Sequence, residues 1–467
     1  MLDLALFTFV MAFLALGFAR PFLWVLAYIY IDILAPQKIG WTLTPMFSIS
    51  LIAFVAAFAG WLATDPKRSV RVHYRQVLML VLLGWAFVTL QWSPFPEAAA
   101  TKWDWVWRAL VFAIFLPFTL TTRNRIEATV LTIVLTAGAI IIATGLKTLG
   151  GGGGYESLYF FVNDNSNIYE SSTLATVAIG LIPLIVWLTR HGTIFRPSRL
   201  VSLFAAGLIF ACLLVPIGTE ARTGLIAIAV LGVLLLREAK NRFAYLFAAV
   251  ALGLVALPFL PASYYERMAT ITGYAGDSSA STRLAVWSWT MDYVAEHPLG
   301  GGFDIYRANS VTYDMPVRTV DGSTVTIQTE RVTDEARAFH SSYFELLGEQ
   351  GWPGFLAWMA LQLSGLVQME RLRRRYRGSG GGESWIAPLA AALQNAHIVY
   401  LVGAAFQGIG YQPVVFLFLG LQIGLWNWVR RYESPQMRET GEAGTGARTG
   451  RRSPRSRRPV PARAAIP

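Results

Sequence analysis

The residues best suited to chemistry on an anionic substrate lie in the middle and the second half of the chain. Arg222 stands in the short connection Gly218–Gly224, directly ahead of an apolar run. A helix N-terminus presents unpaired N–H groups and a positive dipole end, and a guanidinium binds phosphate oxygens in bidentate fashion. Arg222 is therefore a candidate for holding a phosphate or diphosphate. The alternative is an interfacial arginine that reaches toward lipid headgroups or pairs with Glu220.

Two further candidates belong to a long polar insertion between apolar runs. Arg283 precedes Trp287 by one helical turn, and taken alone it is equally an ordinary exposed residue or a partner of Asp277. His340 stands where the insertion returns to apolar sequence. A histidine there is neutral and basic near pH 7, so His340 is a candidate general base.

The other four histidines have simpler explanations. We expect His73 and His191 to be solvated, because both lie among arginines, and His297 to cap or pack beside Pro298. His397 lies in the middle of an apolar run, where a hydrogen-bonded core histidine is the expected role although a functional one stays open.

Metal and nucleotide sites are not indicated. The chain has no His-x-x-x-His pair, no His/Cys cluster, no Gly-x-Ser-x-Gly elbow and no phosphate loop, and the carboxylates of the insertion show no distinctive spacing. Its single cysteine, Cys212, lies within an apolar segment and excludes a disulfide framework. We expect no metal and no cofactor.

The elements that must position these residues are apolar helices. Only 14% of the residues are charged, against about a quarter in soluble domains, which favours burial in a bilayer. The sequence predicts an all-α polytopic membrane protein with twelve or thirteen transmembrane helices, since the first two candidates are separated only by Arg20-Pro21 and form either a hairpin or one bent span. The candidate segments are 4–19, 21–35, 46–64, 76–92, 105–121, 127–146, 168–189, 200–216, 222–236, 243–260, 341–369, 386–406 and 412–429.

The distribution of Lys and Arg predicts the orientation of these helices. Basic clusters lie near 67–75, 123–125, 190–199, 237–242 and 371–377 and in the tail, and they mark the cytoplasmic side. The alternate connections 93–104, 147–167, 217–221, 261–340 and 407–411 are poor in Lys and Arg and face the outer side. The side of the N-terminus depends on how segment 4–35 is counted.

The net charge of +11 does not indicate nucleic-acid binding. From Arg430 to Arg463 there are ten Arg against three Glu, so +7 lies in a tail whose composition predicts disorder. We predict four regions, which are an N-terminal transmembrane bundle (1–260), an outer loop domain (261–340), C-terminal transmembrane helices (341–429) and a disordered basic cytoplasmic tail (430–467).

The loop domain has its own predicted elements. Ser281–Glu296 has helical spacing and ends at Pro298 and Gly300–Gly302. Val317–Ile327 is typical of a short hairpin with an Asp-Gly turn, and we expect a second helix to lead from it through His340.

These motifs resemble a known family. The stretch His340–Gly354 resembles the His-Asn-x-x-Leu…Glu-x-Gly-x-x-Gly signature of the O-antigen ligase and polymerase family, with Ser341 in place of the usual Asn. Arg283…Trp287…His297-Pro298 is similar to that family's Arg…Trp…His-Pro-x-x-Gly stretch.

Two features earlier in the chain extend the resemblance. Arg222-Thr223-Gly224 resembles the family's Ser-Arg-x-Gly helix start, with Ala221 in place of Ser. Arg20-Pro21 and Ile33–Ile39 look like the branch found beside exosortase systems, the O-glycosylation ligases.

The resemblance implies a metal-independent glycosyltransferase at the periplasmic face of the bacterial inner membrane. Its donor is a glycan on undecaprenyl diphosphate, and its acceptor is lipid A core or a protein hydroxyl. Arg222 and Arg283 would hold the diphosphate, His340 would act as general base, and Asn163, Asp164 and Asn165 would contact sugar or diphosphate. An O-antigen or exopolysaccharide polymerase with the same donor is the alternative. A transporter is disfavoured because the sequence shows no repeat and the candidate residues lie at the outer face.

Overall fold

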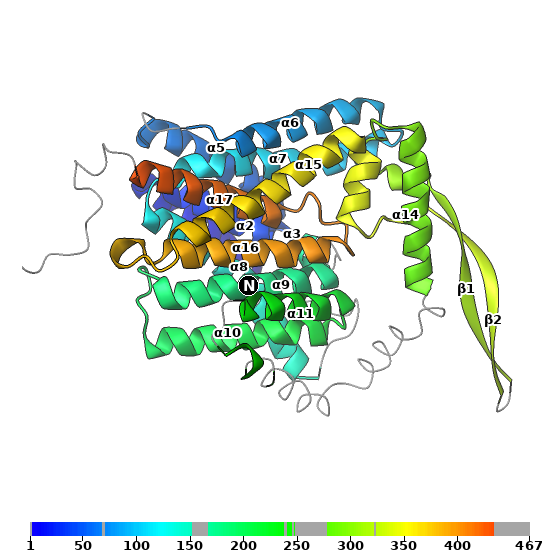
Figure 1. Cartoon of the computed structure of the whole chain (residues 1–467). Coiled ribbons are helices and arrows are strands. Elements are labelled where there is room, and N and C mark those ends of the chain that lie inside the picture. Colours follow the sequence, from blue (N-terminus) through cyan, green and yellow to red (C-terminus); the bar gives the residue numbers. More distant parts are fainter. Residues whose placement is uncertain are drawn as a thin grey trace, which may run out of the picture. The chain divides into compact units, whose positions relative to one another are not determined.

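The computed structural model describes residues 2–67, 71–151, 167–237, 241–244, 247, 278–321 and 324–433. Helices dominate these residues, and a single two-stranded sheet projects beside them (Figure 1). The N-terminal helices are α1 (Leu2–Ala19), α2 (Phe22–Leu34), α3 (Pro36–Ile39), α4 (Leu43–Met46), α5 (Ile49–Thr64), α6 (Tyr74–Thr89), α7 (Pro96–Thr119) and α8 (Arg123–Leu149). They are followed by α9 (Ser171–His191), α10 (Arg199–Gly218), α11 (Arg222–Leu236), α14 (Ser278–Glu296), α15 (Ser342–Arg375), α16 (Ile386–Ala404) and α17 (Pro413–Tyr432).

Each expected apolar segment within the described residues is a helix, which confirms the all-helical membrane class. Seven helices among these residues are long and apolar enough to cross a membrane, namely α1, α6 with its 3-10 extension, α8, α9, α10, α16 with its preceding turn, and α17. Three more, α2, α5 and α11, are apolar but shorter. The protein is therefore a multi-pass membrane protein. The count of twelve or thirteen crossings stays a prediction, and segment 243–260 lies almost wholly outside the described residues.

The N-terminal region is a helical hairpin rather than one bent span. Trp24 in α2 donates its indole N–H to the carbonyl of Leu14 in α1 at 2.7 Å, and Gly17 lies against the same indole. The carboxylate of Asp3 accepts backbone N–H bonds from Thr42, Leu43 and Thr44. The beginning of α1 therefore lies at the same end of the bundle as the loop that follows α2.

Contacts at one end of the bundle join the segments predicted to share the basic side. Arg125 at the start of α8 forms a two-point ion pair with Asp65, with N···O distances of 2.5 and 2.8 Å. Arg123 donates to the carbonyl of His191 at 2.8 Å. The carboxylate of Glu127 accepts from the backbone N–H of Ile194 at 2.7 Å. The geometry thus agrees with the alternation of Lys and Arg along the chain.

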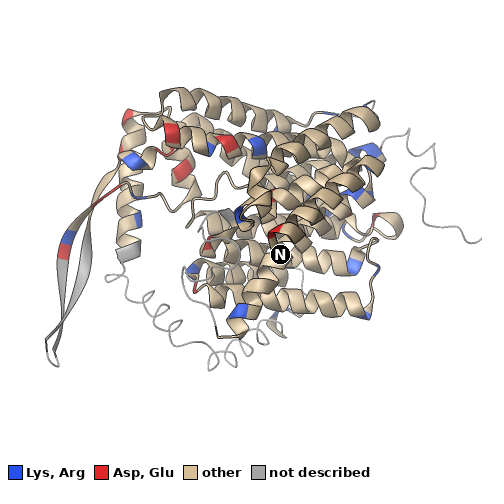
Figure 2. Cartoon of the chain, turned by 180° about the vertical axis from the view of Figure 1, so that it is seen from behind, with Lys and Arg blue, Asp and Glu red and all other residues tan. Residues whose placement is uncertain are grey.

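Contacts at the other end join the segments poor in Lys and Arg. Ser93 donates to the carbonyl of Phe303 at 3.1 Å, and Tyr169 donates to the carbonyl of Leu34 at 2.6 Å. Figure 2 shows acidic residues gathered near this end, close to α14 and the β-hairpin. Which end faces the periplasm stays a prediction.

The expectation that His73 is solvated was wrong. His73 is 7% exposed, caps α6 by accepting from the N–H of Arg75, and lies 2.8 Å from the amide nitrogen of Gln368. Arg75, counted above with a loop cluster, is fully buried and donates to Gln368 and Gln422. His191 is half-buried, and His297 packs on Tyr293 with ring centroids 4.5 Å apart, as expected.

The loop region contains the predicted helix and hairpin but not the second helix. The predicted helix is α14. The strands β1 (Ser310–Asp321) and β2 (Thr324–Glu335) form the hairpin, and they pair antiparallel from Ser310↔Glu335 to Asp321↔Thr324. The hairpin is longer than predicted, and Asp321, which was expected in the turn, is the last paired residue of β1. No helix lies between β2 and His340, because β2 runs to Glu335 and Ala336–Ser341 are irregular. The alternating polar and β-branched residues of 324–335 favour a strand over a helix there.

The four predicted regions remain predictions. Met1–Trp428 form one compact unit and Val429–Pro467 a second, and the tail beyond Glu433 lies outside the described residues.

Candidate functional site

His340 lies in a sharp backbone turn between the hairpin and α15. Its φ of 48° is in the left-handed region, which non-glycine residues adopt only when the surroundings fix it. The preceding Phe339 is 3% exposed and packs with Val286, Ile305 and Val311. The buried neighbour anchors the turn, while His340 itself is exposed.

Helix α14 holds this turn from the loop side. The indole N–H of Trp287 donates to the carbonyl of Phe339 at 2.9 Å. The Trp287 ring also stacks on Phe344 of α15, with ring centroids 4.9 Å apart and planes 7° from parallel. Arg283 lies one helical turn before Trp287 on the same helix. The Arg…Trp spacing of the sequence therefore places a cation next to the His340 turn.

The charge of Arg283 acts on His340. Protein packed around the imidazole removes part of its hydration, and Arg283 repels the protonated ring, so the pKa of His340 lies below its ordinary value. Glu170 opposes this shift and Arg337 adds to it. The neutral, proton-accepting form of His340 is favoured at neutral pH.

The membrane bundle holds the turn from the other side. The hydroxyl of Ser342 donates to the carbonyl of Gln407 at 2.8 Å and accepts from the N–H of Ile409 at 2.9 Å. The side chain of Gln407 in turn donates to Thr176 of α9 at 2.9 Å. His340 is thus fixed by a loop helix and by the connection between α16 and α17.

Arg222 is the first residue of α11 and is half-buried. Gly224 of the same turn lies so close to Ala175 of α9 that an added Cβ would be 3.1 Å away. Glu170, which caps α9 by accepting from the N–H groups of Ser172 and Thr173, acts electrostatically on His340. The start of α11 therefore packs on the first turns of α9, and Glu170 at the beginning of α9 acts on His340. Asn163, Asp164 and Asn165 lie outside the described residues.

Sequence reasoning missed an ion cluster behind the site. Nζ of Lys102 in α7 lies 2.7 Å from carboxylate oxygens of both Glu345 and Glu349, and 3.6 Å from Asp304. Glu349 is fully buried and also accepts from the N–H of Asp304 at 2.9 Å. The available signal was the pair Glu345 and Glu349 at i,i+4 spacing on one helical face. The cluster ties α7 to α15 close to the His340 turn.

The glycines of the two loop motifs serve close packing rather than chemistry. Gly351 has a φ of 61° and interrupts α15, and a Cβ on Gly300 would lie 2.3 Å from its nitrogen. The N–H of Gly301 donates to Gly348, and that of Trp352 to Pro298. The segment 298–301 and the segment 348–352 therefore pack closely together, and this packing fixes the position of α15 relative to the end of α14.

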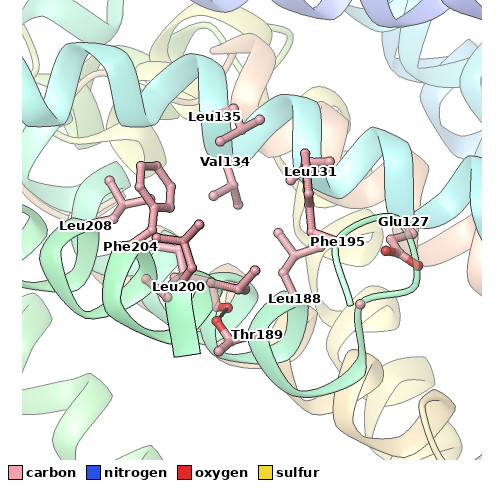
Figure 3. A pocket seen from close by; sticks show the side chains of 14 residues that line it. Glu127, Leu131, Val134, Leu135, Leu188, Thr189, Phe195, Leu200, Phe204 and Leu208 are labelled. Carbon is pink, nitrogen blue, oxygen red and sulfur yellow. Dashed lines mark hydrogen bonds between the residues drawn. The ribbon is translucent and has the colours of Figure 1, made fainter. Parts of the chain in front are cut away.

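A cavity lies among α8, α9 and α10, away from His340. Its volume is about 430 Å³, and its walls are almost wholly apolar, including Leu131, Leu188 and Phe204 (Figure 3). Glu127 at its edge is already satisfied by Thr193 and Ile194. This cavity holds no group suited to bond making.

Comparison with known families agrees with the motif analysis. Residues 207–359 match the family model described as O-antigen ligase, and residues 1–193 match a family of unknown function, DUF5935. No curated protein matches the sequence. The first match spans Arg222, Arg283 and His340. The chain is thus a multi-pass membrane protein in which residues 207–359 are similar to the O-antigen ligase family.

Proposed function

We propose that the protein transfers a glycan from undecaprenyl diphosphate to an acceptor hydroxyl at the periplasmic face of the bacterial inner membrane. The acceptor is lipid A core or a protein. The observation that carries the proposal is that residues 207–359 match the O-antigen ligase family and contain an exposed His340 whose neutral form is favoured by the charge of Arg283.

In the proposed reaction, the acceptor oxygen forms a bond to the anomeric carbon of the donor sugar. The bond from that carbon to the diphosphate oxygen breaks, and undecaprenyl diphosphate leaves with the electron pair. His340 takes the proton from the acceptor hydroxyl. Arg283 and Arg222 stabilise the charge that develops on the departing diphosphate, an effect that is large in a site with little water.

Positive charge supplied by two arginines supports a metal-independent reaction. Transfer by the purified protein is expected to proceed at an unchanged rate in the presence of a chelator. Loss of transfer with chelator, restored by a divalent cation, would contradict this part of the mechanism.

Incubation of the purified full-length protein in proteoliposomes with an undecaprenyl-diphosphate-linked glycan tests the function. Lipid A core and a peptide acceptor are supplied separately, and products are identified by mass spectrometry. Transfer to either is expected. The resemblance of Arg20-Pro21 and Ile33–Ile39 to O-glycosylation ligases supports the protein acceptor. Extension of the lipid-linked glycan alone would instead identify a polymerase.

Cysteine labelling tests the proposed orientation. A Cys212→Ser background carrying Ser323→Cys is expected to react with a membrane-impermeant reagent from the periplasm, and one carrying Ser453→Cys is not. The reverse result would put the site in the cytoplasm.

A further inference from the structure

A cavity that no part of the proposed mechanism uses lies at the same end of the bundle as His340. Its volume is about 560 Å³. The end of α2, the first half of α7, and the residues just before α9 and α17 line it, and they contribute Asp32, Trp105, Arg108, Tyr169 and Gln412. All but the last of these residues lie in the part of the chain that matches the family of unknown function.

The residues around this cavity include buried polar groups. Oε1 of Gln37 is buried with no hydrogen-bond partner among the residues that the structure describes, and the buried hydroxyl of Tyr28 interacts with Ser50, which also lines the cavity. Tyr28 is 1% exposed. A buried polar atom without a partner costs free energy unless a ligand or water supplies one. The lining of the cavity combines these polar groups with apolar residues, and it suits an occupant that carries polar groups.

Charge at the cavity is balanced. Asp32 and Asp104 are matched by Arg108 and Lys38, and Arg108 pairs with Asp104 while its field reaches Asp32. Because these charges balance, the cavity has no net attraction for a phosphate. An uncharged ligand with many hydroxyl groups can donate to the carboxylates and accept from the guanidinium, while its C–H face packs on an aromatic ring such as Trp105. This combination of groups is what a sugar ring requires.

The cavity also adjoins the neighbourhood of His340. A second cavity of about 400 Å³, lined by Lys102, Asp304 and Glu345 among others, shares Thr101, Trp105 and Gln412 with it. Glu345 lies in the first turn of α15, which begins two residues after His340. We propose that the cavity at Asp32 and Trp105 binds an uncharged sugar unit of a glycan whose reacting end lies toward His340. The assignment of this cavity to a glycan substrate rests on the proposed function. Binding of a free sugar to the cavity does not depend on that function.

Saturation-transfer NMR with the purified full-length protein in nanodiscs tests the binding, with N-acetylglucosamine and diacetylchitobiose as probes. The wild type is expected to give a sugar signal. Asp32→Asn removes one charge-assisted hydrogen bond and is expected to weaken binding roughly tenfold. Trp105→Phe provides a second variant of the same wall. Asp292→Asn, an exposed carboxylate on α14, is the matched control and should bind as the wild type does.

Three results would overturn the proposal. They are the absence of any sugar signal with the wild type, undiminished signals in both cavity variants, and displacement of the sugar by phosphatidylglycerol, which would identify a lipid headgroup site. A variant that fails to fold is recognised by its melting temperature, and the other variant then decides.

Transfer kinetics show whether the bound sugar belongs to the donor glycan or to the acceptor. A rise in KM for the lipid-linked donor in Asp32→Asn, with kcat retained, assigns the cavity to the donor glycan, and a rise in KM for the acceptor assigns it to the acceptor. Sugar binding without any transfer by the wild type would refute the proposed function alone. Normal transfer with binding unchanged in both variants would refute the cavity assignment alone.

Discussion

His397 and His340 lie in two polar regions of the molecule, and the surroundings of the two histidines differ. His397 in the bundle is fully buried, its Nε2 lies 2.7 Å from Oε1 of Gln362, and the amide of Gln422 donates to its Nδ1 at 3.1 Å. His340 is exposed in a strained turn, and the charges of Arg283, Arg337 and Glu170 act on it. A histidine whose two nitrogens are both engaged stabilises packing, whereas one that faces an open site is available for proton transfer.

The network around His397 extends across four helices. Gln422 also accepts from Arg75 at 2.8 Å, and Arg75 donates to Gln368 at 3.2 Å. These bonds join α6, α15, α16 and α17 inside the bundle, where an unpartnered polar group is costly. The network therefore holds α15 in place, and α15 in turn carries the residues that follow His340.

Replacement of His340 is expected to have the largest effect on activity. His340→Ala should lower the rate of transfer about 10²–10⁴-fold, because general-base assistance is worth that much. Binding of the lipid-linked donor and the melting temperature should stay close to the wild-type values. His191→Ala, at the opposite end of the bundle, is the control and should transfer normally. Equal activity of the two variants would show that the base lies elsewhere.

The arginines should show the next largest effect. Arg222→Lys and Arg283→Lys keep the charge but lose the planar fork, which should cost roughly ten- to a hundredfold in kcat/KM. Arg331→Lys on the exposed face of β2 is the matched control. If both of the first two variants retain wild-type kcat/KM, the diphosphate is bound by other residues.

His397 should affect stability rather than chemistry. His397→Ala leaves Gln362 and Gln422 without their partner, at a cost of about 1–3 kcal/mol in the free energy of unfolding. A lower melting temperature is expected, with kcat per folded molecule unchanged. A large fall in kcat at unchanged stability would instead make His397 part of the reaction.

The smallest effect should be a shift in pH dependence. Because the pKa of His340 is lowered, its neutral form persists as pH falls, and the acidic limb of kcat/KM should lie below the ordinary histidine value of about 6.5. Arg283→Gln removes a cation that disfavours protonation, so the acidic limb should move to higher pH. An acidic limb at the same pH in this variant would show that Arg283 does not act on the titrating group.

Much of the architecture was predictable because it depends on contiguous residues. Apolar runs predicted the helices. The alternation of Lys and Arg predicted which connections share an end of the bundle, and the contacts of Arg125 and Glu127 agree with that grouping. The segment before His340 was predicted wrongly, because a short polar stretch carries little periodicity and pairing with β1 decided its conformation.

The sequence by itself determined the membrane class, the helical segments and the motif around Arg222, Arg283 and His340. Only the tertiary structure decided that His73 and Arg75 are buried, that Lys102 pairs with Glu345 and Glu349, and that α1 and α2 form a hairpin. The physical reason is that hydropathy and charge act over neighbouring residues, whereas these partners lie far apart in the chain. Their pairing depends on which helices pack together, and residue spacing does not encode that.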